Sequence, residues 1–270
     1  MEVYAYYSRT DKGAEKQSLK QHIEESLKAF ENEIKDTKVW GYYANISKFD
    51  EEIVEKWMKF TITFHDIGKI FYQRNFGHYN GKTYLNFTGH EFFSTFLADK
   101  FLNIWLKKDV ESRITEYGDF RWIVCASILY HHHAMGLKNR ERLNVIKVCE
   151  ENEFNEIVKA IYKILLSNLE DFEENVIVSF VNKLRRFNLA KILDRNAIAD
   201  IFRYVDELNA KIWENFVSVD GFRRQMILST NLLVLADYKG SESRSEKPTK
   251  FGEILNEFIE LYKIKNQNFK

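Results

Sequence analysis

His65 and Asp66 stand side by side at the end of an apolar stretch, and Lys69 follows three positions after the aspartate. The surrounding segment, residues 60–75, reads FTITFHDIGKIFYQRN, so an ionisable pair lies where the chain is otherwise suited to burial. Burying a carboxylate is costly unless it is paired or coordinates a metal ion. The pair is therefore either a coincidence of two satisfied core residues or part of a metal site.

Other ionisable side chains occur at similar places. His22 lies on the apolar stripe of a predicted helix, and His90 falls in the first turn of another. The triplet 131–133 closes the apolar stretch WIVCASILY, and Asp237 follows LLVLA. Taken alone, each has an ordinary explanation, because buried polar groups usually find hydrogen-bond partners. Together they favour a shared site inside the helices.

Imidazole and carboxylate ligands suit Mn, Fe, Co, Ni and Zn, and Mg where carboxylate and water dominate. The chain has two cysteines, Cys125 and Cys149, which argues against a structural thiolate zinc site. An aspartate beside a histidine can bridge two ions, and two ions about 3.5–4 Å apart can activate water and stabilise both oxygens of a phosphodiester displacement. The pattern predicts a dinuclear centre of this kind.

The elements that must position these residues are mostly helical. One proline, Pro248, leaves long helices uninterrupted. Apolar spacing of three and four predicts helices, and a Thr88-x-x-Glu91 capping box and an Asp119 N-cap mark two of the starts. The expected helical stretches are 18–34, 49–66, 89–106, 119–136, 220–240 and much of 150–215 and 251–265. Asn80-Gly81 predicts a hairpin turn, residues 3–7 a short extended piece and 238–250 a surface loop. We expect one mainly α domain over residues 1–270.

Composition limits the partners. Forty basic residues balance forty acidic ones, so any contact with nucleic acid must come from local patches. Candidates are two basic segments that follow predicted ligands, with Lys138 and Arg140 in one and Lys239 and Arg244 in the other. The start lacks a secretory signal pattern, and the longest near-apolar run, MILSTNLLVLA, is too short for a membrane span. We expect a soluble, cytoplasmic protein without a membrane partner.

The order of these motifs resembles the HD superfamily of metal-dependent phosphohydrolases. More narrowly, it resembles the stand-alone HD nuclease of type I CRISPR interference, the nuclease half of the nuclease-helicase. The matching segments are, in order, SLKQHIEES, HDIGK, GHEFFS, SILYHHH and LLVLADYKGS, and they span residues 18–241. The resemblance implies a helical bundle of the HD type with at most a short β-hairpin.

The resemblance also implies roles for individual residues. One metal ion would be held by His22, His65, Asp66 and Asp237, with Asp66 bridging to a second ion held by His90, His131 and His132. Lys69 would steady the phosphate or the charge of the transition state. His133 stands where the family usually has glycine, so His132 and His133 remain an alternative ligand pair. Asp194 in KILDRNA is a rival for the late aspartate.

The activity implied is hydrolysis of single-stranded DNA by a metal-bound hydroxide in CRISPR antiviral defence, with RNA left open as a substrate. The cofactors would be two divalent ions, Mn, Mg, Ni, Co or Fe. The chain carries no helicase motif, so a separate helicase subunit and the CRISPR interference complex are the expected partners. The alternatives are an HD-type nucleotide phosphohydrolase and a non-catalytic HD module that binds metal or partners.

Overall fold

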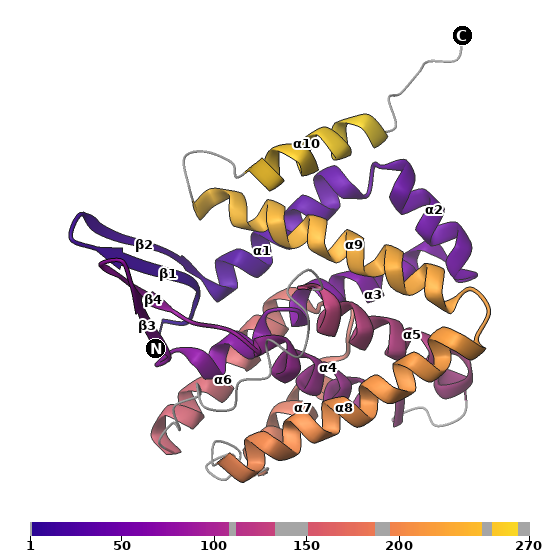
Figure 1. Ribbon diagram of the computed structural model, residues 1–270. Helices are drawn as coiled ribbons and strands as arrows, with labels where there is room; N and C mark the ends of the chain where they lie inside the picture. The colour runs from indigo at the N-terminus through magenta and orange to yellow at the C-terminus, as the bar shows by residue number, and fades with distance from the viewer. Residues whose placement is uncertain (1, 108–111, 133–150, 187–194, 245–249, 264–270) are drawn as a thin grey trace.

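Helices make up most of the molecule (Figure 1), which confirms the mainly α fold. The computed structural model describes residues 2–107, 112–132, 151–186, 195–244 and 250–263. Within these ranges the α-helices are α1 (Leu19–Ala29), α2 (Lys38–Ser47), α3 (Glu51–Phe64), α4 (His90–Lys107), α5 (Ser112–Tyr130), α6 (Glu151–Asn168), α7 (Glu174–Arg186), α8 (Arg195–Ser218), α9 (Phe222–Ser241) and α10 (Lys250–Tyr262).

A small antiparallel sheet projects from one side of the helices (Figure 1). Its strands are β1 (Tyr4–Thr10), β2 (Gly13–Ser18), β3 (Phe76–Tyr79) and β4 (Lys82–Leu85), in the order β2-β1-β4-β3. The hairpin predicted at Asn80-Gly81 is confirmed, and both turn residues have a positive φ, as a tight hairpin turn requires. The extended piece near the start forms a second hairpin, whose strand β1 pairs with β4.

Three boundaries differ from the sequence expectation. The first helix ends its regular α part at Ala29 and continues as a π-helical turn, Phe30–Ile34. Helix α5 begins at Ser112, so the expected start at Asp119 is wrong. Asp119 would suit an N-cap, but it lies inside the helix. The segment expected to be a loop from 238 onward is helical at first: α9 runs to Ser241 and a 3-10 turn, Glu242–Arg244, follows.

The hydrophobic core brings five chain segments together around one point. Helix α1 packs along α9, α9 packs on α5, and α5 packs on α4. The 3-10 segment Ile67–Tyr72, which follows α3, lies against α4. Figure 1 shows α9 crossing the molecule, with α10 on one side and α3, α4 and α5 on the other. No helix among the described residues is both long and apolar enough to cross a bilayer.

Candidate metal centre

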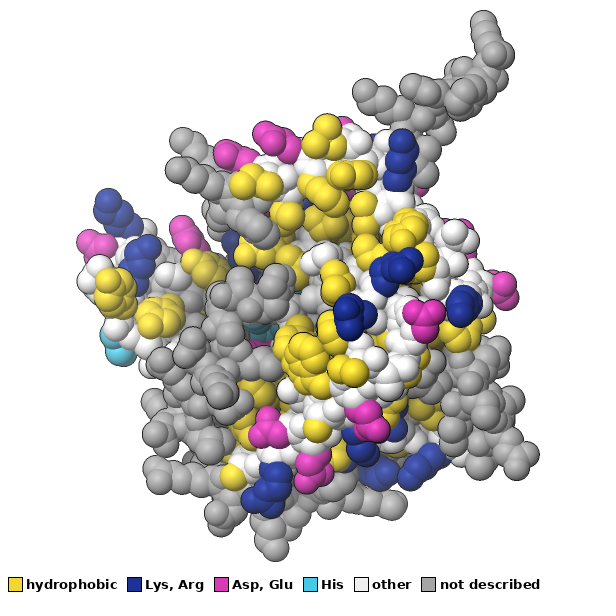
Figure 2. Space-filling view, turned by 45° about the vertical axis from the view of Figure 1, so that its right-hand side comes forward, with side chains coloured by type: hydrophobic (Ala, Val, Ile, Leu, Met, Phe, Trp, Pro, Cys, Tyr) yellow, Lys and Arg dark blue, Asp and Glu magenta, His cyan; other side chains and the backbone are white. Residues whose placement is uncertain are grey.

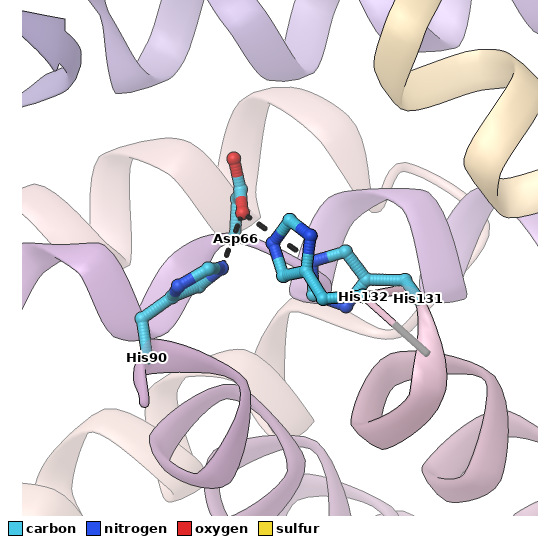
Figure 3. Close-up of side chains that lie close together, drawn as sticks. All are labelled: Asp66, His90, His131 and His132. Atoms are coloured by element: carbon cyan, nitrogen blue, oxygen red, sulfur yellow. Dashed lines mark ion pairs between the residues drawn. The ribbon is translucent and has the colours of Figure 1, made fainter. Parts of the chain in front are cut away.

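Seven ionisable side chains that are far apart in the sequence converge at the junction of these segments. They form two groups of four that share Asp66, and in each group one ligand atom per residue lies within 4.8 Å of the others. The first group is Asp66, His90, His131 and His132 (Figure 3), and the second is His22, His65, Asp66 and Asp237. The structure thus brings together all seven residues that the sequence predicts as ligands.

Asp66 stands between the two groups and turns one carboxylate oxygen toward each. Its Oδ1 lies 2.8 Å from Nε2 of His90 and 3.8 Å from Nε2 of His131. Its Oδ2 lies 3.1 Å from Nε2 of His22 and 3.6 Å from Nε2 of His65. Lys69 Nζ also contacts Oδ2, at 2.5 Å. A carboxylate with this orientation can serve two cations at once.

Three of the imidazoles are held by the same backbone contact. Nδ1 of His65 lies 2.6 Å from the carbonyl oxygen of Ile62, and Nδ1 of His131 lies 2.6 Å from that of Ile128. Nδ1 of His90 makes the equivalent contact with the carbonyl three residues earlier, at 2.7 Å. A carbonyl only accepts hydrogen bonds, so Nδ1 carries the proton and the lone pair of the neutral ring lies on Nε2. These three rings therefore present a metal-binding nitrogen to the centre.

His22 is the exception. Its Nδ1 lies 3.2 Å from Nη2 of Arg244, and a guanidinium can only donate, so here Nδ1 is the acceptor. The proton of the neutral ring then lies on Nε2, which faces the carboxylates of Asp66 and Asp237, each at 3.1 Å. Arg244 is held in this position by Oε1 of Gln17, at 2.5 Å. In this tautomer Nε2 of His22 carries a proton, which must move to Nδ1 before Nε2 can bind a cation.

The donor set fits divalent metal ions. Within the described residues, Nε2 of His22, His65, His90 and His131 and Oδ1 of Asp66 are buried and make no well-aligned hydrogen bond. Two ligands on one ion with bonds of about 2.1 Å lie about 3.0 Å apart at a right angle and about 3.4 Å apart in a tetrahedron. The nitrogen–oxygen separations of 2.8–3.8 Å around Asp66 cover this range.

The charges of the centre favour ionised carboxylates. Burial would raise the pKa values of Asp66 and Asp237, but nearby cationic and hydrogen-bonding groups outweigh it and hold both well below the usual range. Burial, reinforced by the neighbouring histidines, lowers the pKa of His131 to about 4. For His65 the two aspartates outweigh burial, and its pKa is raised. His131 is therefore neutral at any physiological pH.

Two glycines allow the close backbone contacts that bring the ligands together. A Cβ on Gly68 would lie 2.2 Å from the carbonyl oxygen of His90 and 2.7 Å from the amide nitrogen of Ser94. A Cβ on Gly240 would lie 2.1 Å from Oγ of Ser26, on α1. Gly68 therefore lets the segment after Asp66 rest on the first turn of α4, and Gly240 lets α9 approach the helix that carries His22.

The remaining predicted residues lie in varied positions. Lys239 is nine-tenths buried in ion pairs with Glu33 and Glu242, at 3.1 and 3.0 Å, so its charge is already balanced. Arg244 faces His22 and not the solvent side of a loop. His133, Lys138, Arg140 and Asp194 lie outside the described residues, so the choice between the histidine pairs stays a prediction.

Sequence analysis missed the placement of one acid. Glu91 was considered only as a capping residue, yet its side chain is fully buried, with Oε2 3.5 Å from Nδ1 of His90. A glutamate directly after a predicted ligand, inside a helix that is apolar on most sides, was the available signal.

Comparison with known proteins places this geometry in context. The chain is 29% identical over 259 residues to the CRISPR-associated endonuclease Cas3-HD of Methanocaldococcus jannaschii. The alignment covers 92% of this chain and 94% of that protein. The resemblance to a CRISPR HD nuclease is confirmed. No family model and no solved structure matches the chain. The aligned region includes most of the chain, so the similarity to Cas3-HD extends well beyond the short HD motif.

Proposed function

We propose that this protein is a metal-dependent nuclease that hydrolyses phosphodiester bonds of single-stranded DNA in CRISPR antiviral defence. The observation that carries the proposal is the orientation of Asp66, whose two oxygens face two separate sets of imidazoles. The similarity to a Cas3-HD endonuclease supports a nuclease role in a CRISPR system. A separate helicase subunit and the interference complex would deliver the single strand.

The residues of the centre have distinct tasks in this proposal. His22, His65 and Asp237 would hold one divalent cation and His90, His131 and His132 the other, with Asp66 shared. When bound, two such cations supply positive charge to the phosphate and lower the pKa of a water molecule. Lys69, buried beside Asp66, would add a fixed positive charge where the phosphate develops negative charge.

Access to the centre is from the side of Asp237 and His132. The side chain of Asp237 is 13% exposed and His132 is partly exposed, whereas His22, His65 and Asp66 are fully buried. Figure 2 shows histidine and acidic side chains at the base of a recess that is bordered on one side by hydrophobic side chains. A phosphodiester would enter there, while the deeper ligands stay shielded from water.

The decisive experiment is cleavage of circular single-stranded DNA, which has no ends, with Mn²⁺ or another divalent ion. We expect cleavage by the wild type and loss of both activity and one cation in Asp66→Ala, measured by gel assay and elemental analysis. His78→Ala is the matched control, because His78 is an exposed histidine on β3, outside the centre. Full cleavage by metal-replete Asp66→Ala would refute the proposal. Hydrolysis of free nucleotides with circular DNA left intact would favour a nucleotide phosphohydrolase. Metal binding without any turnover would favour a non-catalytic module.

A further inference from the structure

We infer that Trp213 and Phe216 on α8, with Arg223 at the start of α9, form a stacking site for single-stranded nucleic acid at the α8–α9 turn. The inference rests on the proposed function, because it describes where the protein holds the single strand that is to be cut. We refer to these three residues as the aromatic platform.

The aromatic platform is joined to the last residue of α5 by one hydrogen bond. Nε1 of Trp213 donates to Oη of Tyr130, at 2.8 Å, and Tyr130 directly precedes the predicted ligand His131. Oη of Tyr130 in turn donates to Oδ1 of Asn209, at 2.8 Å, which fixes the tyrosine. The polar edge of the indole is therefore satisfied toward the protein. The Trp213 side chain is nevertheless 45% exposed, which leaves ring surface available to a ligand.

The rings of the platform are arranged to remain in place without a ligand. The centroids of Trp213 and Phe216 are 4.8 Å apart, with the ring planes at 62°. The guanidinium carbon of Arg223 lies 4.7 Å from the centroid of the Phe216 ring. Edge-to-face and cation–π contacts of this kind hold aromatic groups in fixed positions. A base can then stack without much further ordering of the protein.

The charge beside the rings suits a phosphate backbone. A groove of about 570 Å³ at the α8–α9 turn is lined by Phe216, Arg223 and Arg224 among others. The groove lining contains two exposed arginines and one aspartate, Asp220, so its net charge is positive. Among the described residues, neither arginine has a carboxylate within ion-pair distance. Figure 2 shows basic and hydrophobic side chains interspersed on the same face as the recess of the metal centre.

These features favour nucleic acid over a protein partner. Every base offers a π-face, so an exposed indole beside unneutralised arginines binds single strands without regard to sequence. Val217, Val219 and Ile227 add apolar surface to the same groove, so a protein partner is the competing occupant, and the oligomeric state of Trp213→Ala distinguishes the two.

The test measures binding without metal, so that it does not depend on hydrolysis. A fluorescein-labelled thymidine oligonucleotide is titrated in chelator and followed by anisotropy, and KM for cleavage is measured separately with Mn²⁺. We expect Trp213→Ala to raise Kd about tenfold, since one stacking aromatic accounts for roughly this factor. Trp213→Phe keeps a ring without the Tyr130 hydrogen bond and should stay within about threefold of the wild type. Arg223→Gln should reduce the slope of log K against log salt by about 0.7, as expected for one lost phosphate contact.

Tyr79→Ala is the control, because Tyr79 is a 70% exposed aromatic residue on the β3–β4 hairpin. It should leave Kd as in the wild type. Equal losses in Trp213→Phe and Trp213→Ala would overturn the inference, because the hydrogen bond and not the ring would then matter. An unchanged Kd in Trp213→Ala would overturn it as well. So would a wild-type dimer that becomes a monomer in Trp213→Ala while oligonucleotide binding stays the same. If the protein bound the oligonucleotide through Trp213 but cleaved no DNA, only the proposed function would be refuted. If it cleaved DNA normally and both Kd and KM were unaffected by Trp213→Ala, only the inference would be refuted.

Discussion

His131 should make the metal-free protein sensitive to acid. Its ring is fully buried, and its pKa is lowered to about 4, first by burial and then by the neighbouring His65 and His90. In the unfolded chain the same group has a pKa near 6.5. As the pH falls below 6.5, the unfolded chain therefore takes up a proton that the folded chain does not. The stability contributed by neutral His131 is fully present above about pH 6.5 and is lost as the pH falls toward 4.

The size of the effect follows from the two pKa values. The difference between 6.5 and about 4 corresponds to about 3 kcal/mol of unfolding free energy when the pH has fallen below both values. At pH 5 the folded group is still largely neutral and the unfolded group largely charged, so about 2 kcal/mol of this is already lost. His65 acts in the opposite direction, because its raised pKa contributes stability that is lost as the pH rises. A comparison of two proteins that both retain His65 largely removes that contribution.

The assay is urea unfolding in chelator at pH 7 and pH 5, for the wild type and for His131→Gln. Glutamine has no titrating group, so the wild type should lose about 2 kcal/mol more than the variant between the two pH values. His78→Gln, at an exposed position on β3, should behave as the wild type. If the wild type and His131→Gln lost the same stability within about 0.5 kcal/mol, the reasoning about a buried neutral ring would be wrong.

Three further outcomes are expected. Gly68→Ala should lower the unfolding free energy by about 2 kcal/mol or more in the same urea assay, because the added Cβ would clash with the backbone of His90. Gly41→Ala is the control: a Cβ there meets no atom within 4 Å, so this variant should be neutral or slightly stabilising. Arg244→Ala should tighten the weaker of two Mn²⁺ sites severalfold in calorimetry. Without the guanidinium, Nδ1 of His22 can carry the proton and Nε2 is left to bind the ion. Unchanged Mn²⁺ affinities would contradict the assigned tautomer. Removal of metal should lower the melting temperature, since an ion present at 100 times its Kd adds about 2.7 kcal/mol to stability, and an equal melting temperature in Mn²⁺ and in chelator would argue against a folded-state metal site.

The helices were predictable because their apolar residues recur at helical spacing and their interiors contain few breakers. Pairing of β1 with β4 was not, since it joins Ser8 to Tyr84 across a long separation and depends on how the helices bring the hairpins together. The start of α5 was misplaced because Asp119 is a suitable cap by local chemistry, and a cap signal does not stop a helix whose preceding turn can continue.

The candidate ligands were predictable because histidine and aspartate inside apolar helices need a reason to be there. The resemblance already implied that Asp66 bridges two ions. Which of its oxygens faces which histidines depends on how the tertiary fold arranges the segments that carry them, and the order of the motifs does not show this. The contact of Arg244 with His22 was also beyond reach, because it joins the first helix to a turn more than two hundred residues later. Lys239 looked like a free cation from its basic neighbourhood, but Glu33 on the first helical segment neutralises it.

The two halves of the centre differ in how ready they are for a cation. His90 and His131 already present Nε2 toward Oδ1 of Asp66, and backbone carbonyls fix their tautomers. On the other side, Oδ2 is engaged by Lys69, and His22 directs a proton inward because Arg244 opposes its outer nitrogen. A cation there must displace both arrangements. The free energy for that change comes out of its binding energy, so the His22 side should fill second, and Arg244 sets the difference between the two affinities.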